Sequence, residues 1–477
     1  MLTHALPYHT DTALLFARIA HLDWAMWLDS GQLINPVTGQ PGSQYGHFDI
    51  LVCLPSSTFV TQGKTTCMNQ NGQITYSNED PFNLLKVALN HFATSTALPS
   101  NIPFAGGALG YFGYDLAQHI EKLNDQVQIA ANIPQLMVGI YDCAVVVDHR
   151  EKTAFLVTQN VHQNARENFD ALQALFCAAS GGGETKSAFK VTSEVISNMQ
   201  KSQYAEAFDR VKNYILEGDC YQVNLAQRFA ASATGDGWQA YQKLREISPA
   251  PFMAYMHLPG LEVISGSPER FLQVVNQHVE TRPIKGTRPR SNDAEQDELN
   301  AKALQNSPKD RAENVMIVDL LRNDISKNCE IGSVKAEKLF QLQSFANVHH
   351  LVSIITGKLA QGKTALDLLR GCFPGGSITG APKLRAIQII EELEPHQRGL
   401  YCGAIGYIGF DGNMDTNIAI RTAVYTHAKT NTQVEGGEVS FYAGGGIVAD
   451  STMEKEYVET LDKASSMMKL MQFFQSK

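Results

Sequence analysis

The order of predicted elements along the 477-residue chain constrains its fold most. Segments rich in β-branched and aromatic residues recur in both halves, for example FDILVCL (48–54), GIYDCAVVVDH (139–149), FMAYMHL and LEVISGS. Such segments predict strands. Helical patterns occur among them, but without the regular strand–helix–strand alternation that builds a parallel sheet. The sequence therefore predicts an α+β architecture built on antiparallel sheets.

Helices are expected at 81–93, 202–219, 308–326, 382–394 and 454–472, where apolar residues recur with helical spacing or a start signal is present. The helix at 308–326 has the clearest start, because Ser307 can cap it and Pro308 suits its first position. A Gly-, Ser- and Thr-rich stretch at 178–194 predicts a linker between an N-terminal region (1–177) and a C-terminal region (195–472).

Composition excludes several classes of protein. The chain is 44% hydrophobic and 18% charged, as expected of a globular protein with a large core. Its net charge of −9 argues against a nucleic-acid binder or an anionic-membrane binder. No apolar run is long enough for a membrane span, and no export signal is recognisable. The eight cysteines form no C-x-x-C pair, which predicts reduced thiols in a cytoplasmic protein.

Two acidic pairs have the spacing of neighbours on a helix. Asp310 and Glu313 lie three residues apart, and Glu456 and Glu459 do so in the last predicted helix, with Lys463 on the same face. Each pair taken alone is typical of helix-capping or surface acids. If the two helices faced each other, the carboxylates would form an all-oxygen ligand set suited to Mg²⁺. Spacing alone leaves both interpretations open.

Other stretches allow two interpretations as well. Gly444, Gly445 and Gly446 either form a tight strand-to-helix turn or expose N–H groups to an anion. Lys285 lies in TRPIKGTRPR (281–290), which is either a solvated basic loop or the setting of a nucleophilic amine. Glu269 precedes it by sixteen residues, and a strand–turn–strand would bring the amine and the carboxylate into one pocket.

Several ordered motifs resemble those of one family. They are AGGALGYFGYD (105–115), SPERF, PIKGT, LLRND (320–324), HHLVS, GGSITGAPK and AGGGIVAD. Together they resemble the chorismate-utilising enzymes, which include anthranilate, isochorismate, salicylate and aminodeoxychorismate synthases. The resemblance covers essentially the whole chain. It implies one fold of two large antiparallel sheets packed face to face, with helices outside and the N-terminal region interwoven with the chorismate-binding region.

The resemblance also implies roles for individual residues. It implies a Mg²⁺ ion bound by Glu313 and Glu459, with Asp310 and Glu456 beside them. The substrate's carboxylates are expected at Tyr407, Arg421, Lys463 and the amides of Gly444, Gly445 and Gly446. Thr287 and His350 are expected to line the ring site, and Glu269 to assist departure of the C4 hydroxyl.

Two positions indicate the branch of the family. Isochorismate and salicylate synthases carry a water-activating lysine where this chain has Gln222, and anthranilate synthases typically read PIAGT where this chain reads PIKGT. The lysine resembles the aminodeoxychorismate synthase branch, in which Lys285 would attack C2 of chorismate and ammonia would then add at C4. Arg282, Arg288 and Arg290, together with burial, are expected to lower the pKa of Lys285. Anthranilate synthase, and a ligand sensor without catalysis, are the alternatives.

Two partners follow from the resemblance. The chain has no recognisable glutaminase nucleophile, so a separate glutamine amidotransferase subunit is expected to supply ammonia. A tryptophan pocket is expected between the N-terminal sheet and a loop of the other half of the chain, lined by Ser30, Tyr45, Gly46, His47, Phe48, Pro251, Phe252 and Met253. LDS at 28–30 departs from the LES of anthranilate synthases, so the tryptophan is as readily structural as inhibitory. Plain packing of these aromatic and proline side chains is the alternative.

Overall fold

The computed structural model describes residues 1–31, 47–93, 98–99, 101–121, 123, 128–129, 131–161, 164–178, 187–291, 293–344, 348–428 and 436–475. Tyr45 and Gly46, two of the predicted tryptophan-pocket residues, lie outside the described residues.

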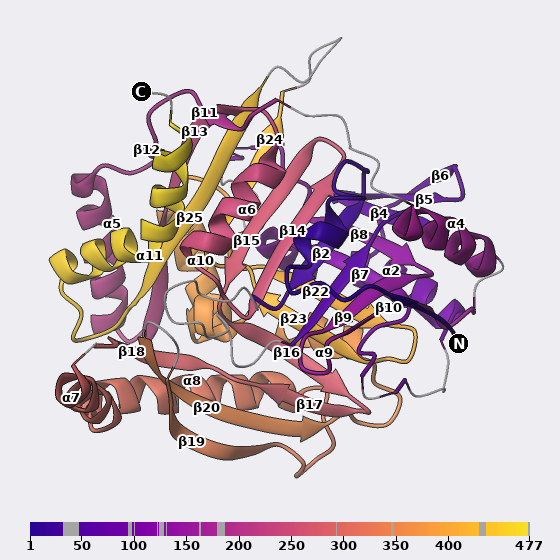
Figure 1. Ribbon diagram of the computed structural model, residues 1–477. Coiled ribbons are helices and arrows are strands. Elements are labelled where there is room, and N and C mark those ends of the chain that lie inside the picture. Colours follow the sequence, from indigo (N-terminus) through magenta and orange to yellow (C-terminus); the bar gives the residue numbers. More distant parts are fainter. Residues whose placement is uncertain are drawn as a thin grey trace.

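Two large antiparallel sheets form the molecule (Figure 1). Within the described residues the first sheet has 13 strands, of which eleven follow the order β1-β10-β9-β3-β2-β14-β15-β24-β25-β13-β11, while β12 and β21 also pair with β13. Their bounds are β1 (Leu2–Leu6), β2 (Ala25–Asp29), β3 (Phe48–Val52), β9 (Ala144–Asp148), β10 (Thr153–Thr158), β11 (Lys190–Val191), β12 (Ile196–Ser197), β13 (Gln222–Thr234), β14 (Phe252–Leu258), β15 (Leu261–Ser267), β21 (Gly380–Ala381), β24 (Thr422–His427) and β25 (Gly437–Ile447).

The second sheet has 12 strands in the described residues, in the order β18-β20-β17-β16-β23-β22-β7-β8-β4-β5-β6, with β19 also paired to β20. Their bounds are β4 (Ser57–Gln62), β5 (Thr65–Gln70), β6 (Gln73–Ser77), β7 (Gly107–Phe112), β8 (Leu136–Tyr141), β16 (Arg270–Val275), β17 (His278–Thr281), β18 (Ile284–Pro289), β19 (Lys335–Ser344), β20 (Val348–Lys358), β22 (Ala404–Gly409) and β23 (Met414–Ile418).

The helices cover the outer faces of the sheets (Figure 1). They are α1 (Ala13–Phe16), α2 (Pro81–His91), α3 (Ala117–Ile120), α4 (Ala165–Cys177), α5 (Lys201–Leu216), α6 (Gly237–Ile247), α7 (Ala294–Gln305), α8 (Pro308–Ser326), α9 (Ala365–Cys372), α10 (Lys383–Leu393) and α11 (Met453–Phe474), with 3₁₀ turns η1 (Tyr114–Leu116) and η2 (Gly376–Ile378). In the part of the chain that the structure describes, none of these helices is long and apolar enough to cross a bilayer.

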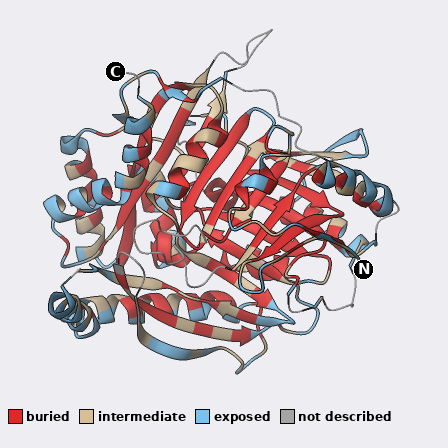
Figure 2. Ribbon diagram, viewed as in Figure 1, coloured by how far each residue is buried: buried red, intermediate tan, exposed pale blue. Residues whose placement is uncertain are grey.

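The core has a layered arrangement that explains this fold. Met26 and Ile50 of the first sheet pack against Leu109 and Ile405 of the second, so the sheets bury their inner faces against each other. Separate apolar clusters join α6 and α11 to the outer face of the first sheet, and α8 and α9 to that of the second. Figure 2 shows the buried residues concentrated along the strands. The predicted α+β fold of two antiparallel sheets is confirmed.

Strands from distant parts of the sequence pair directly. In the first sheet β2 pairs with β14, and in the second β7 pairs with β22. Most predicted elements are present, and the helix at 308–326 has the predicted bounds, with the Ser307 hydroxyl accepting a hydrogen bond from the Asp310 N–H at 3.3 Å. The segment IAIRTAVY (418–425), whose β-branched residues predict a single strand, is not one strand, however. The backbone bends at Arg421, whose φ of +50° lies in the left-handed region, so this segment is divided between β23 and β24.

Candidate functional site

Lys285 lies on β18 and its amine points toward η2, where the Ser377 carbonyl accepts a hydrogen bond from Nζ at 3.5 Å. Burial lowers the pKa of Lys285, and the Lys463 ammonium acts in the same direction, while the Glu269 carboxylate opposes both. The amine therefore has the environment of a nucleophile rather than that of a solvated surface lysine.

The arginines around Lys285 do not have the predicted effect on it. Arg282 contacts Glu280 at 2.7 Å, Arg288 contacts Asp310 at 2.9 Å, and Arg290 is held by an aspartate of α7 at 2.9 Å. Each guanidinium is thus neutralised by its own carboxylate. This is a correction to the sequence-based expectation, because burial and a lysine from α11 lower the pKa of the amine instead.

Glu269 lies in the short connection between β15 and β16. Burial raises its pKa, although Lys285, Lys463, a hydrogen bond from the Ser377 hydroxyl and Arg421 all act to lower it. The backbone fixes this position, since the Ile418 N–H donates to the Glu269 carbonyl at 3.0 Å. A carboxyl group that retains its proton more readily than usual lies next to an amine that loses its proton more readily than usual.

The two acidic pairs face each other across the site. Lys309 of α8 contacts Glu313 at 3.7 Å. Burial raises the pKa of Glu456 on α11, whereas Lys463 lowers that of Glu459, and the Lys309 charge acts to lower both. Burial raises the pKa of Glu313, and Glu459 adds to that shift. Spacing could not show this convergence, which results from the packing of two helices on different sheets.

These acids already have partners of their own. Asp310 is paired with Arg288, Glu456 accepts from the Ser451 hydroxyl at 2.6 Å, and Glu459 lies 2.7 Å from Lys463. Among the described residues, no three acidic, histidine or cysteine side chains form a ready-made metal cage. Mg²⁺ commonly takes one or two protein carboxylates and completes its shell with water and substrate oxygens, so the all-oxygen set fits that ion.

The three glycines lie inside β25 rather than in the turn after it, as one interpretation of the sequence had it. Their register places Gly444 opposite Ala226 and Gly446 opposite Asn224 on β13. On the other side, β24 pairs with β25 only as far as Phe441, which leaves that edge of the glycines open. A Cβ on Gly445 would lie 3.2 Å from Glu456 Oε2 and 3.4 Å from Glu459 Oε1. The missing side chains therefore allow the helix carboxylates to approach the strand.

His350, Thr287 and Arg421 complete this cluster. Thr287 Oγ1 and His350 Nδ1 are 2.9 Å apart across the β18–β20 pair. Burial and the Arg421 guanidinium lower the pKa of His350 to about 4, so the imidazole is neutral at physiological pH. Arg421 and Glu269 interact electrostatically, which puts the guanidinium at the same site. Its left-handed backbone conformation turns it there from the end of β23.

Tyr407 lies elsewhere. It lines a second cavity with Arg270 and Asp415, and its ring packs 5.2 Å from that of Phe104. The alternation of side chains along β22 directs it away from the Lys285 cluster. The predicted role of Tyr407 in holding a substrate carboxylate is therefore wrong for this position.

Sequence reasoning did not find Ser377 or Asn224, which belong to the site. Asn224 follows Gln222 by two residues on β13, and both side chains have a buried polar atom without a hydrogen-bond partner among the described residues. The alternation of a strand would have placed them on one face. Ser377 was hidden in a Gly-rich segment whose turn geometry is not predictable from its residues.

The second cavity, of about 410 Å³, lies between the sheets. Six of the eight residues predicted for the tryptophan pocket line it, namely Ser30, His47, Phe48, Pro251, Phe252 and Met253. Its polar end is fixed, because the Ser30 hydroxyl donates to Asp49 at 2.7 Å and Asp29 is held by Arg245 at 2.6 Å. The Arg270 guanidinium stacks 5.0 Å from the Phe252 ring. An aromatic molecule with a cationic group fits such a lining.

The chain belongs to the chorismate binding enzyme family, whose sequence pattern matches residues 52–469. It is 44% identical over 464 residues to aminodeoxychorismate synthase component 1 of Salmonella typhimurium, covering 97% of this chain and 96% of that one. The Escherichia coli protein of the same name is 45% identical over 454 residues, with 95% and 94% covered. The crystal structure of anthranilate synthase component I from Streptococcus pneumoniae superposes with a TM-score of 0.75 at 31% identity, covering 89% of this chain and 93% of that one.

Proposed function

We propose that this protein is the synthase component that converts chorismate and ammonia to 4-amino-4-deoxychorismate, the precursor of 4-aminobenzoate and folate. The observation that carries the proposal is the Lys285 amine beside Glu269 in the substrate site of a chorismate binding enzyme. The 44–45% identity to two aminodeoxychorismate synthase components, against 39% over 396 residues to anthranilate synthase component 1 of Bacillus caldotenax, supports this branch.

In the proposed reaction, the neutral amine of Lys285 attacks C2 of the ring while Glu269 gives a proton to the departing C4 hydroxyl. The ring double bonds shift, and water leaves. The lysine nitrogen is then bonded to C2 as a positively charged ammonium group. Ammonia adds at C4, the double bonds return, and the C2–N bond breaks, so that Lys285 leaves as a neutral amine with the electron pair of that bond. The Glu269 carboxylate takes back one proton from the new C4 ammonium group, which restores both residues to their starting forms. The raised pKa of Glu269 and the lowered pKa of Lys285 suit these acid and nucleophile roles.

The remaining residues would hold the substrate. Arg421, Lys463 and the open edge of Gly444, Gly445 and Gly446 offer charge and N–H groups to its carboxylates. Thr287 and neutral His350 would line the ring. Mg²⁺ would be held by Glu313 and Glu459, with Asp310 and Glu456 as neighbours, and would supply positive charge to the ring carboxylate.

Gln222 favours amination over hydration. Its amide has no basic lone pair with which to activate water, so attack by water at C2 lacks a catalyst. Anthranilate synthase activity, with ammonia at C2 and loss of pyruvate, is the alternative. It would leave Lys285 without a role.

Two partners belong to the proposal. A glutamine-hydrolysing subunit would supply ammonia, which is supported by the "component 1" names of the relatives. L-Tryptophan would occupy the second cavity, with its ring against Phe252 and Met253 and its ammonium toward Ser30 and the acids behind it. We place the protein in the cytoplasm, where its eight free cysteines would stay reduced.

One experiment tests the function. The purified chain is incubated with chorismate, an ammonium salt and Mg²⁺, and the product is identified by mass. Formation of 4-amino-4-deoxychorismate is expected, with pyruvate retained. Anthranilate and free pyruvate as the products would refute the proposal in favour of the alternative.

A further inference from the structure

Two of the sequence motifs, LLRND and GGSITGAPK, are joined by an ion pair between Asp324 and Lys383. Asp324 lies near the end of α8, and Lys383 is the first residue of α10. Lys383 Nζ lies 2.6 Å from Asp324 Oδ2, and the Asp324 side chain is only 2% exposed. Lys327 contacts the same carboxylate at 3.3 Å. The pair is therefore a buried contact between two helices that are distant in the sequence.

Neither charge of the ion pair stabilises the helix that carries it. A helix has partial negative charge at its C-terminal end and partial positive charge at its N-terminal end. An aspartate near the end of α8 and a lysine at the start of α10 are thus both unfavourable for their own helices. Burial of a carboxylate adds a further cost unless the group has a partner. These local costs indicate that the pair serves the segment that it holds in place.

That segment is the loop between α9 and α10, residues 373–382, which we call the η2 loop. Lys383 directly follows it, and Nζ of this lysine donates a hydrogen bond at 2.8 Å to the carbonyl of Cys372, which directly precedes it. One ammonium group therefore joins the two ends of the loop. Through Asp324, the same ammonium group joins both ends to α8.

The η2 loop has little rigidity of its own. Gly375, Gly376 and Gly380 lack the side chains that would limit its backbone, and ordering a glycine costs more conformational entropy than ordering other residues. Close contact with α8 requires such a sequence, since a Cβ on Gly376 would lie 2.6 Å from the Leu320 side chain and 3.3 Å from Asp324 Oδ2. The loop therefore depends on neighbouring elements for its position.

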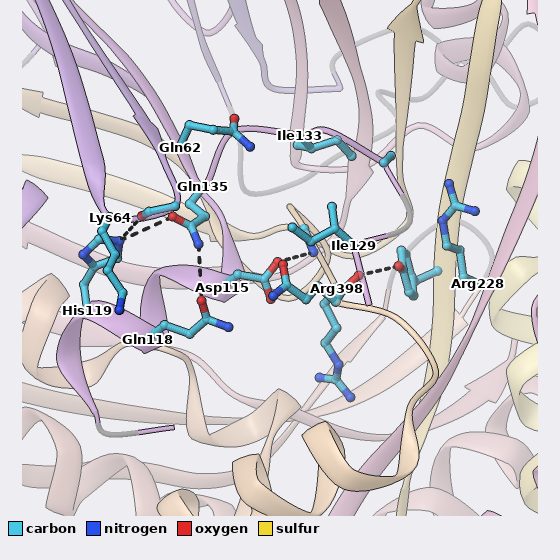
Figure 3. Close-up of a pocket in the computed structure, with 15 residues that line it drawn as sticks. Gln62, Lys64, Asp115, Gln118, His119, Ile129, Ile133, Gln135, Arg228 and Arg398 are labelled. Carbon is cyan, nitrogen blue, oxygen red and sulfur yellow. Dashed lines mark hydrogen bonds between the residues drawn. The ribbon is translucent and has the colours of Figure 1, made fainter. Parts of the chain in front are cut away.

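Contacts on another side hold the η2 loop to the first sheet. The Thr379 carbonyl accepts a hydrogen bond from the Asn224 N–H at 2.8 Å, and the Ile378 carbonyl accepts one from the Arg398 guanidinium at 3.2 Å. Arg398 also lines a cavity of about 260 Å³, and Figure 3 shows its guanidinium extending away from the other labelled residues of that cavity. The loop is thus held by β13 and Arg398 as well as by the ion pair on α8.

Ser377 lies in the middle of the η2 loop and contacts both reacting side chains. Its carbonyl accepts a hydrogen bond from Lys285 Nζ at 3.5 Å, and its hydroxyl donates one to the Glu269 carboxylate. A neutral amine that donates to a fixed carbonyl has its lone pair directed elsewhere, so the place of Ser377 sets the direction of attack. A misplacement of about 1 Å in such a geometry can cost on the order of a hundredfold in rate.

We propose that Asp324 and Lys383 are positioning residues for the amination of chorismate. Their ion pair fixes the η2 loop, and through Ser377 it directs the Lys285 amine and the Glu269 carboxyl group at the ring. The inference rests on the function proposed above. Because the substrate carboxylates would be bound from other elements, among them α11 and β25, loss of the ion pair should slow the attack without weakening the binding of chorismate.

The test replaces each partner and measures the first chemical step. Asp324→Asn and Lys383→Met each remove one charge with little change in shape, whereas Lys383→Arg keeps the charge. Lys86→Met is the matched control, because Lys86 forms an ion pair with Asp367 at 2.7 Å in the first turn of α9, outside the η2 loop. Adduct formation on Lys285 from chorismate and Mg²⁺ without ammonia is followed by intact-protein mass. The kcat with ammonium, the KM for chorismate and the melting temperature are measured in parallel.

Asp324→Asn and Lys383→Met should each slow adduct formation and lower kcat at least about tenfold, with KM for chorismate within about twofold of wild type. The double variant should be no slower than the slower single variant, because both changes break the same contact. Lys383→Arg should recover most of the rate, and the control should behave as wild type.

Wild-type rates in both charge-removing variants would overturn the proposal. Loss of chorismate binding, or a melting temperature far below that of the control, would also overturn it, because the ion pair would then support the fold as a whole. Failure of the wild type itself to form the adduct and 4-amino-4-deoxychorismate would instead refute the proposed function.

Discussion

Asp115, in the 3₁₀ turn η1, should make the stability of the protein depend on pH. Its carboxyl group accepts a hydrogen bond from the Gly399 N–H at 2.8 Å and helps to hold the segment that carries Arg398. Burial raises its pKa from 3.8 to about 7, although the Gly399 and Arg398 N–H groups and the Arg398 charge oppose that shift. In the unfolded chain the carboxyl ionises near its ordinary pKa, whereas in the folded protein it keeps its proton until about pH 7.

The sign and size of the effect follow from this difference. Between the two pKa values the folded state binds one more proton than the unfolded state, so the free energy of unfolding falls by about 1.4 kcal/mol per pH unit as pH rises. Over the two units from pH 5 to pH 7 this amounts to roughly 2 kcal/mol, because half of the folded molecules have already lost this proton at pH 7. Asp115→Asn resembles the protonated acid and cannot ionise, so it should remove this contribution.

Urea unfolding of both proteins at pH 5 and pH 7, followed by tryptophan fluorescence, measures the effect. The difference in unfolding free energy between Asp115→Asn and wild type should shift in favour of the variant by roughly 2 kcal/mol on going from pH 5 to pH 7. The comparison between two pH values cancels any constant cost of the substitution. Parallel curves for the two proteins would show that Asp115 is already ionised at pH 5 and would refute the reasoning.

Three further outcomes are expected. When incubated with chorismate without ammonia, wild type should form a covalent adduct that intact-protein mass spectra detect, and Lys285→Ala should form none. Lys285→Arg should also form none, because a guanidinium stays protonated. An adduct on the alanine variant would exclude the covalent role of Lys285. Glu313→Gln or Glu459→Gln should lower activity strongly, with only partial recovery in excess Mg²⁺, and an ordinary Mg²⁺ response would exclude these ligands. Calorimetry should show tryptophan binding to ligand-free protein and at least tenfold weaker binding to Phe252→Ala, and no heat from the wild type would reject the site.

The fold was largely predictable because its elements have local causes. Strand residues alternate or form apolar runs, and the cap at Ser307 and the proline after it set the start of α8. The bend at Arg421 was not predictable, since no glycine or proline marks its left-handed backbone. The position of Tyr407 was missed for a related reason. The residues around Tyr407 predict a strand, but they do not predict which face of that strand borders the substrate. That depends on how the two sheets stack.

The electrostatics of the site depended on contacts that sequence does not contain. Arg288 is adjacent to the Lys285 segment in sequence, yet its charge is neutralised by Asp310 on another element. Lys463 is distant in sequence, yet it lowers the pKa of Lys285. Proximity along the chain was therefore a poor guide to the charges that act on the amine, whereas the residue types were a good guide to the chemistry.

Because Lys285 lies next to Glu269, the transfer of one proton from the lysine to the glutamate can bring both groups into their reactive forms. An ammonium and a carboxylate become an amine and a carboxylic acid when a single proton moves between them, and the net charge of the pair does not change. Burial disfavours charge on both side chains and so favours the neutral pair, while their mutual attraction favours the ion pair. The Lys463 charge acts to lower the pKa of both Lys285 and Glu269. It therefore favours the neutral amine of Lys285 but disfavours the protonated carboxyl group of Glu269. A substrate carboxylate that neutralised Lys463 would remove this effect from both groups, which would favour a protonated Glu269 but also a protonated Lys285.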